Sequence, residues 1–186
     1  MVVDYLVTKF KKMKIGVACV YLNHKEVDSQ TPSRLLAGLW RQLVDADVGP
    51  LARKLYTRYQ EKGTAPILKE VASVLVSTVK DFSKVFIIVD AMDEYPGSQR
   101  HILLRCLAKI SSNVNLMITS RPNISPKHYT FQNLEILNIC ARPKDIHTYI
   151  DAQINSSALI HRIPQLQEPS VQEEIHEKIS GAADGM

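Results

Sequence analysis

Five consecutive apolar residues, Val85 to Val89, constrain the fold of this chain more than any other segment. A strand with one face in solvent alternates apolar and polar side chains, whereas a strand covered on both faces is apolar at every position. Strands of the second kind belong mainly to parallel sheets, whose crossover helices cover both faces. The segment therefore predicts an α/β fold with a parallel sheet and helices on both sides of it.

The rest of the chain alternates between strand-like and helical patterns. Short apolar runs bounded by polar turns predict further strands at 15–22, 114–119 and 134–139. Apolar residues at helical spacing predict helices at 2–10, 32–43, 51–61, 66–81 and 99–110. The pair Thr31-Pro32 is a typical helix start, because the hydroxyl can cap the first turn and proline suits the first helical position. Strands that alternate with helices predict right-handed crossovers between parallel neighbours.

A wholly helical pattern follows the last expected strand. Helices are expected from 142 to 154 and from 170 to 183, with prolines at 164 and 169 between them. We therefore divide the chain into an α/β core, residues 1–141, and a helical subdomain, residues 142–186. A chain of 186 residues that is 45% hydrophobic can bury one sizeable core with a small appended unit.

Composition and charge exclude several classes of protein. No apolar run approaches the roughly 20 residues that span a bilayer, and Asp4 with the lysines after it interrupts any signal-peptide core. The 23 basic residues are scattered among 19 acidic ones without interleaved aromatic residues, which argues against specific nucleic-acid binding. Cys19, Cys106 and Cys140 form no CxxC pair and lie in apolar surroundings, as is typical of a reducing compartment. We expect a cytoplasmic protein without a membrane segment.

Three carboxylates follow the buried strand directly. Asp90 comes immediately after Val89, and Asp93 and Glu94 lie in the same turn. Ligands of open α/β sheets gather at the carboxyl ends of strands, and a nearby cation relieves the repulsion among carboxylates. Mg²⁺ is the natural cation, because it takes one or two carboxylates together with waters and phosphates. The alternative is structural, with Asp90 as a turn cap and the other two acids in a solvated approach to the next helix.

A second polar group is expected at the same edge of the sheet. The strand at 114–119 ends in Ser120-Arg121-Pro122, and parallel strands deliver their carboxyl ends together. Ala91 is small and leaves room beside the first carboxylate. These two features favour the ligand-binding interpretation over the purely structural one.

Together these motifs resemble a known family of ATPases. The string VFIIVDAMDE, residues 85–94, is similar to the extended Walker B motif of NACHT domains, and TSRP, residues 119–122, resembles their sensor 1. Further similarity lies at 15–26, 31–43 and 179–186, so nearly the whole chain resembles a fungal NACHT module of nephrocystin-like type, in the STAND class of P-loop NTPases. The resemblance implies a three-layer parallel sheet of the P-loop NTPase type followed by a small helical subdomain.

The resemblance also implies roles for individual residues. Asp90 is expected to bind Mg²⁺ through water, and Asp93 and Glu94 to position or activate the attacking water. Arg121 is expected to sense the γ-phosphate of bound ATP or GTP. This division of roles matches the electrostatic requirements of phosphoryl transfer. None of the six histidines shows the HExxH spacing, and we interpret them as structural or surface residues.

The sequence contains no phosphate-binding loop. Such a loop needs GxxxxGK[ST], and none of the seven glycines precedes a lysine. The resemblance places residues 1–10 on the helix that follows the loop, so we expect the loop and the first strand of the sheet to precede this chain. It also implies that the helical subdomain and further domains continue beyond residue 186. Because a neighbouring strand then lacks its partner, we expect marginal stability, sheet rearrangement or association through the exposed edge.

Three functions are compatible with these residues. The first is a regulatory ATP- or GTP-binding switch module with Walker B and sensor 1, which has no independent ATPase activity because nothing grips the β- and γ-phosphates. The second is a non-catalytic interaction or scaffold module of a signalling or self-recognition protein, with protein partners or self-association. The third is a phosphohydrolase of the haloacid-dehalogenase type, which fits less well because its DxD motif is tighter than the spacing of Asp90 and Asp93.

Overall fold

The structure is a computed structural model that describes residues 2–10, 13–44, 48–110, 112–122, 124, 131, 134–157, 163, 165 and 168–183. The chain divides into two compact units, Met1–Gln132 and Asn133–Met186. The boundary at 141/142 that the sequence suggests between the α/β core and the helical subdomain stays a prediction.

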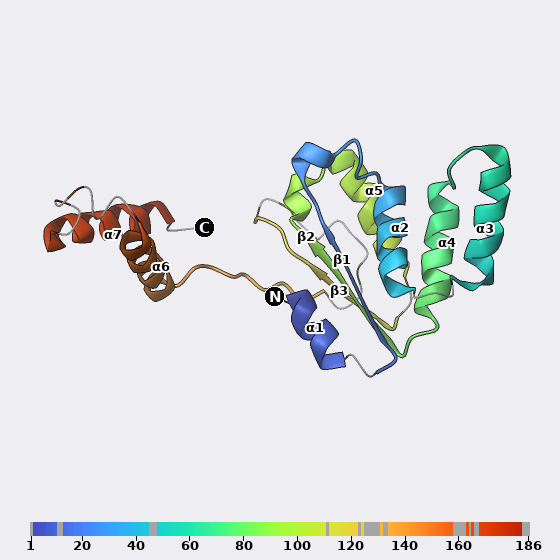
Figure 1. Ribbon diagram of the computed structural model, residues 1–186, viewed down its shortest axis with the longest axis horizontal. Coiled ribbons are helices and arrows are strands. Elements are labelled where there is room, and N and C mark those ends of the chain that lie inside the picture. Colours follow the sequence, from blue (N-terminus) through green and yellow to red (C-terminus); the bar gives the residue numbers. More distant parts are fainter. Residues whose placement is uncertain are drawn as a thin grey trace. The chain divides into compact units, whose positions relative to one another are not determined.

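The first unit is an α/β fold built on a parallel sheet (Figure 1). Its strands are β1 (Ile15–Tyr21), β2 (Lys84–Asp90) and β3 (Val114–Ile118), in the order β1-β2-β3. The helices are α1 (Val2–Phe10), α2 (Pro32–Leu43), α3 (Gly49–Lys62), α4 (Leu68–Val79) and α5 (Gly97–Leu107), with the short 3₁₀ turns η1 (His24–Glu26) and η2 (Met92–Glu94). The parallel sheet and the interspersed helices predicted from the sequence are confirmed for this unit.

The register of the sheet brings the carboxyl ends of the strands together. Tyr21, the last residue of β1, lies beside Asp90, the last residue of β2. On the other side of β2, Val89 lies beside Ile118 at the end of β3. The residues that follow each strand therefore start from one edge of the sheet.

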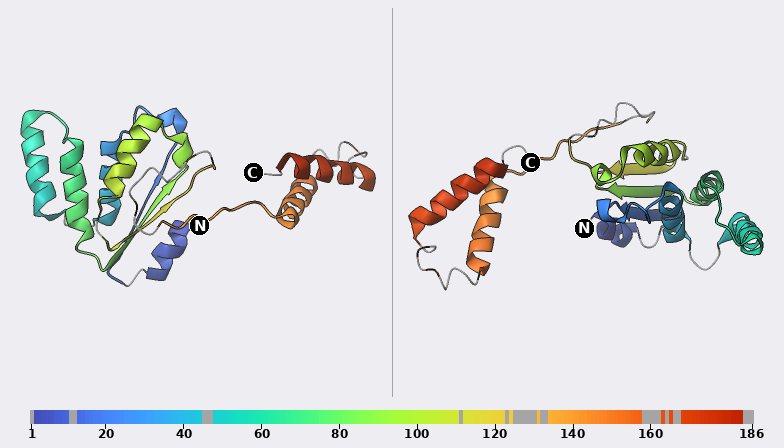
Figure 2. Two further views of the ribbon diagram at one scale, coloured as in Figure 1. Left: turned by 180° about the vertical axis from the view of Figure 1, so that it is seen from behind. Right: turned by 90° about the horizontal axis from the view of Figure 1, so that it is seen from above.

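Helices cover both faces of the sheet. Figure 1 shows α1 on one side of the strands and α2, α4 and α5 on the other, and Figure 2 shows the same arrangement from behind. On the α1 side, the ring of Phe10 stacks on that of Phe86, with centroids 5.5 Å apart. On the opposite side, Val85, Ile87 and Val89 are fully buried in the main core. Burial of alternate residues toward different helices explains why this strand is apolar throughout.

Close packing of α2 on β1 depends on a glycine. A Cβ atom at Gly16 would lie 2.7 Å from the Cδ2 atom of Leu43, which is closer than carbon atoms pack. The start of α2 agrees with the sequence, because the hydroxyl of Thr31 accepts a hydrogen bond from the amide of Arg34 at 3.4 Å. At the other end of the helix, Leu43 is buried.

A side-chain amide occupies the outer edge of β1. The Oε1 atom of Gln42 accepts a hydrogen bond from the amide of Cys19 at 2.9 Å, and its Nε2 donates to the carbonyl of Cys19 at 2.8 Å. The side chain of Gln42 thus pairs with the peptide groups of Cys19 as a neighbouring strand would. Such protection limits pairing of an edge strand with other chains.

The strand predicted at 134–139 is wrong. Residues 134–140 have no regular secondary structure, and their apolar side chains are exposed, from 47% for Leu134 to 80% for Ile139. A strand is stable only when a neighbour pairs with its peptide groups and its side chains are buried. None of the described strands pairs with this segment, so its apolar pattern does not produce a strand.

The second unit contains the two helices predicted for the end of the chain, α6 (Pro143–Ser156) and α7 (Pro169–Ala183). Ile150 of α6 is buried. The ring of His147 stacks on that of His176 with centroids 4.7 Å apart, and Nε2 of His176 lies 2.8 Å from Oδ1 of Asp151. In the described residues of both units, no helix combines the length and the apolar character needed to cross a membrane.

Candidate functional site

The predicted site lies where the chain leaves β2. Ala91 adopts left-handed backbone angles, with φ 56° and ψ 49°, so the chain turns sharply from the strand into η2. The carbonyl of Asp90 accepts a hydrogen bond of 3.1 Å from the amide of Leu22, which extends the pairing with β1 to the last residue of β2. The turn places Asp93 and Glu94 in η2, immediately beyond the edge of the sheet.

Thr119 holds the carboxylate of Asp90. Its hydroxyl donates a hydrogen bond of 2.5 Å to Oδ1 of Asp90 and accepts one of 3.0 Å from the amide of Ala91. The carbonyl of Thr119 also accepts a hydrogen bond of 2.9 Å from the amide of Met92. Thr119, a single residue that follows β3, therefore orients both the carboxylate of Asp90 and the left-handed turn after β2.

Arg121 holds the carboxylate of Asp93. The amide of Arg121 donates a hydrogen bond of 3.1 Å to Oδ1, and its Nε lies 3.4 Å from Oδ2. The side chain of Asp93 is only 9% exposed, whereas that of Arg121 is 77% exposed. The expectation that the loop after β3 would approach the acidic turn is met by this contact. The predicted role of Arg121 in phosphate sensing stays a prediction.

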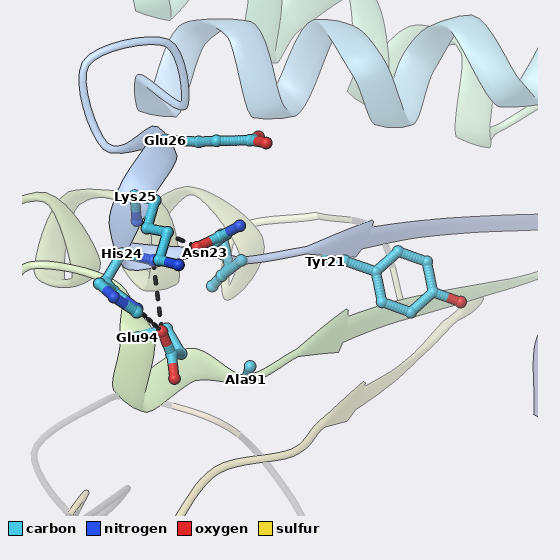
Figure 3. Close-up of a pocket in the computed structure, with 8 residues that line it drawn as sticks. Tyr21, Asn23, His24, Lys25, Glu26, Ala91 and Glu94 are labelled. Carbon is cyan, nitrogen blue, oxygen red and sulfur yellow. Dashed lines mark hydrogen bonds and ion pairs between the residues drawn. The ribbon is translucent and has the colours of Figure 1, made fainter.

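Glu94 contacts the loop after β1. Its Oε2 accepts a hydrogen bond of 3.3 Å from the amide of His24 and also contacts Nδ1 of the same residue. Figure 3 shows the carboxylate of Glu94 directed toward His24. The hydrogen bond from the His24 side chain is the main reason why the pKa of Glu94 lies below its ordinary value.

A hollow of about 540 Å³ lies beside this pair, between the loop after β1 and the start of η2 (Figure 3). The residues that line it are Tyr21, Leu22, Asn23, His24, Lys25, Glu26, Ala91 and Glu94. Of the four predicted site residues, only Glu94 reaches this hollow. Asp90 and Asp93 instead contact residues that follow β3.

A buried tyrosine supports the loop that carries His24. Tyr95 is 1% exposed, and its hydroxyl donates a hydrogen bond of 2.5 Å to the carbonyl of Gln30. The side chain of Gln30 in turn bonds the carbonyl of Tyr21 at 3.0 Å and the amide of Asn23 at 3.1 Å. Burial raises the pKa of Tyr95 to about 12, so its phenol is neutral at physiological pH.

Of the three acids, the carboxylate of Asp90 is the one whose surroundings are compatible with a bound Mg²⁺. Oδ1 of Asp90 accepts the hydrogen bond of Thr119, and among the described residues no hydrogen bond or ion pair is made to Oδ2. One free carboxylate oxygen is compatible with Mg²⁺, which keeps several of its waters and is bound through one or two carboxylates. Among the same residues, no group of three or more histidine, cysteine or acidic side chains is arranged to hold a metal ion. Binding of Mg²⁺ at Asp90 therefore stays a prediction.

The structure gives each acid a partner of its own instead of directing all three to one point. Thr119 contacts Asp90, Arg121 contacts Asp93, and His24 contacts Glu94. These separate partners relieve the repulsion that the sequence alone indicates. Thr119 and His24 were not among the predicted site residues. Both follow strands that neighbour β2, and a search that includes the last residue of every expected strand and the residues just after it would have found them.

The fold and the strand-end acids define an α/β protein with a polar site at the carboxyl edge of a parallel sheet. The family model for the nephrocystin 3 N-terminal region matches residues 1–121. Because this match covers more than half of the chain, the protein belongs to that family. The comparison with curated proteins gives no match to the chain. The family match supports the nephrocystin-like resemblance stated from the sequence.

Proposed function

We propose that this chain is part of a NACHT-type regulatory switch module of the STAND class that binds ATP or GTP with Mg²⁺. The observation that carries the proposal is the bridge between strand ends, in which Thr119 after β3 orients the carboxylate of Asp90 after β2. A carboxylate held in this way at the carboxyl edge of a parallel sheet is suited to the water shell of Mg²⁺. Membership of the nephrocystin 3 N-terminal family supports the same conclusion.

The other residues of the site have separate roles in this proposal. Asp93 and Glu94 are the carboxylates that position or activate water, and Arg121 is the cation that responds to the γ-phosphate. Arg121 is 77% exposed, so its guanidinium is accessible to a nucleotide, while its backbone amide anchors Asp93. Opposite charges placed around a transferring phosphoryl group are the main requirement for its chemistry.

The chain by itself is not expected to hydrolyse nucleotide. Its sequence has no GxxxxGK[ST] loop, and backbone amides with a lysine normally provide most of the grip on the β- and γ-phosphates. The site residues can hold the metal and water, but they cannot position the phosphates. The proposed activity therefore requires a phosphate-binding element in addition to these residues.

Metal and nucleotide titrations of the 186-residue chain test the proposal. Mn²⁺, used as a paramagnetic substitute for Mg²⁺, is expected to bind weakly to the wild-type chain and to lose this binding in Asp90→Asn. Glu61→Gln is the matched control, because it removes an exposed carboxylate of α3 that lies outside the site. Equal binding by wild type and Asp90→Asn would contradict a metal site at Asp90. Micromolar binding of Mg·ATP, or its hydrolysis, would show that no further phosphate-binding element is needed.

A second candidate function is a non-catalytic interaction module. Exposed apolar side chains favour it: Ile136, Leu137 and Ile139 are 56%, 77% and 80% exposed within the short segment 134–139. Exposed apolar groups that cluster in this way are typical of surfaces that contact another protein. Concentration-dependent light scattering of the wild type and of Leu137→Lys would distinguish this function, since only an interaction surface would make the wild type associate more strongly.

A further inference from the structure

Two loops hold the acids that the proposed function assigns to water activation. The loop after β3 holds Asp93 through Arg121, and the loop after β1 holds Glu94 through His24. Asp93 is 9% exposed, so this carboxylate is part of the packed structure. Glu94 is 26% exposed and lines the hollow, so it is the more accessible of the two. The contact that restrains Glu94 therefore has the greater effect on the chemistry of the site.

His24 contacts a single carboxylate oxygen of Glu94 through two of its nitrogen atoms. Its backbone amide and its ring nitrogen Nδ1 both contact Oε2 of Glu94. The loop that carries His24 is itself held in place, because Oδ1 of Asn23 accepts a hydrogen bond of 3.0 Å from the amide of Lys25. The amide of Asn23 donates in turn to Oε1 of Gln30 at 3.1 Å. The backbone of His24 is thus presented to Glu94 in a defined position.

Packing does not explain the position of the His24 ring. Its side chain is 64% exposed, so burial contributes little to its orientation. The described contacts of the ring are made to Glu94 (Figure 3). A side chain in this situation is oriented by its polar partner, and it is free to leave when that partner moves.

We propose that His24 is a positioning residue that holds the Glu94 carboxylate toward the loop after β1, and that the site becomes competent for chemistry only when this pair separates. The inference rests on the proposed function, because it concerns the regulation of the same site. A carboxylate can orient or deprotonate a water only when an oxygen atom is free to accept its hydrogen bond. Hydrogen bonds to Oε2, which also lower the pKa of Glu94, make the restrained carboxylate a weaker base.

Two basic side chains lower the pKa of Glu94, and the partial burial of its carboxylate acts against them. His24 contacts the carboxylate directly, and the more distant positive charge of Arg121 also lowers the pKa of Glu94. Separation from His24 removes the largest of these influences and leaves that of Arg121. Movement of the loop after β1 would therefore increase the basicity of Glu94 without disturbing the contact between Arg121 and Asp93.

A carboxyl titration of the full chain tests whether His24 holds Glu94 in solution. With ¹³C-labelled glutamate, the Glu94 signal of the wild type is expected to titrate below the ordinary value of 4.5, and His24→Ala is expected to shift it upward. His24→Asn should reverse part of this shift, because its side-chain amide can still donate. Glu70 is the internal control, since its pKa is lowered mainly by the hydroxyl of Tyr59. Identical titration of Glu94 in wild type and His24→Ala, with Glu70 unchanged, would overturn the proposal.

Paramagnetic broadening by Mn²⁺ separates this inference from the proposed function. If Mn²⁺ binds at Asp90, the Glu94 signal should broaden more in His24→Ala than in the wild type, because the released carboxylate can approach the metal. Equal broadening in both proteins would overturn the positioning role. Absence of broadening that depends on Asp90 would contradict the proposed metal site. In that case the titration without metal still decides whether His24 restrains Glu94.

Discussion

The hydroxyl of Thr119 donates a hydrogen bond of 2.5 Å to Oδ1 of Asp90, although the two residues are 29 positions apart in the chain. The same hydroxyl accepts a hydrogen bond of 3.0 Å from the amide of Ala91. Thr119 thereby links the ends of β2 and β3 and orients the carboxylate on which the proposed metal site depends.

Substitution of Thr119 by valine should separate this polar role from its packing role. Valine keeps the shape of the side chain but leaves the amide of Ala91 and Oδ1 of Asp90 without this partner. We expect a loss of about 1 kcal/mol in the free energy of unfolding, measured by urea denaturation. Thr119→Ser retains the hydroxyl and should lie closer to the wild type. Equal stability of the valine variant and the wild type would show that the bridge contributes nothing.

Two glycines should respond to alanine in opposite ways. Gly38 lies within α2 with nothing within 4 Å of the position that a methyl group would take, so Gly38→Ala should raise stability by up to about 1 kcal/mol. Gly16 lies in β1, where the same methyl group would meet Leu43 at 2.7 Å, so Gly16→Ala should destabilise the protein by about 1–3 kcal/mol. Thermal and urea unfolding of both variants measure the two effects. Stabilisation by alanine at position 16 would contradict the close packing of α2 on β1.

The amide of Gln42 should protect the edge of β1. In Gln42→Ala the amide and carbonyl of Cys19 lose their partners, which leaves an open edge on the sheet. We expect a loss of about 1 kcal/mol in the free energy of unfolding, measured by urea denaturation. We also expect increased self-association, measured by light scattering at several concentrations. Gln60→Ala, at an exposed position of α3, is the matched control. An identical response of the two variants would mean that the edge needs no protection.

Tyr95 should make the protein sensitive to alkaline pH. Its folded-state pKa of about 12 lies above the ordinary value of 10.0, because burial penalises the phenolate. The stabilising contribution is therefore complete below pH 10 and is lost as the pH rises toward 12, because the unfolded chain releases the proton first. Urea unfolding at several alkaline pH values measures this loss.

The variant Tyr95→Phe isolates the effect of this phenol. It loses the hydrogen bond to the carbonyl of Gln30 and should be less stable than the wild type at neutral pH. The difference should shrink between pH 10 and 12, because only the wild type carries the buried phenol. Tyrosinate absorbance of the wild type minus that of the variant gives the titration of Tyr95 directly. A difference in stability that is independent of pH would contradict the burial of this group.

The buried central strand and the helices could be predicted, because the signals for both are local in the chain. The run Val85 to Val89 has no polar face, so only coverage on both sides can bury it, and the structure confirms this. Helices such as α2 carry their own periodicity and capping residues, because each helix forms its backbone hydrogen bonds within itself. Their bounds therefore follow from nearby residues.

The segment 134–139 shows where this reasoning ends. Its pattern is as apolar as that of a strand, but its side chains are exposed and it forms no strand. A strand obtains its hydrogen bonds from a distant part of the chain, and a local pattern does not reveal whether that partner exists. The same limit applies to the loop contacts of the candidate site.

The sequence by itself determined that three carboxylates follow a buried strand and that an arginine follows the next one, because strand ends share an edge in a parallel sheet. Only the tertiary structure decided how the carboxylates are used: Thr119 holds Asp90, Arg121 holds Asp93, and His24 holds Glu94. The physical reason is that each contact joins residues at or just after the ends of different strands. A side-chain hydrogen bond forms only when its donor and acceptor lie within a few tenths of an ångström of about 2.9 Å. The packing of the whole sheet sets that distance.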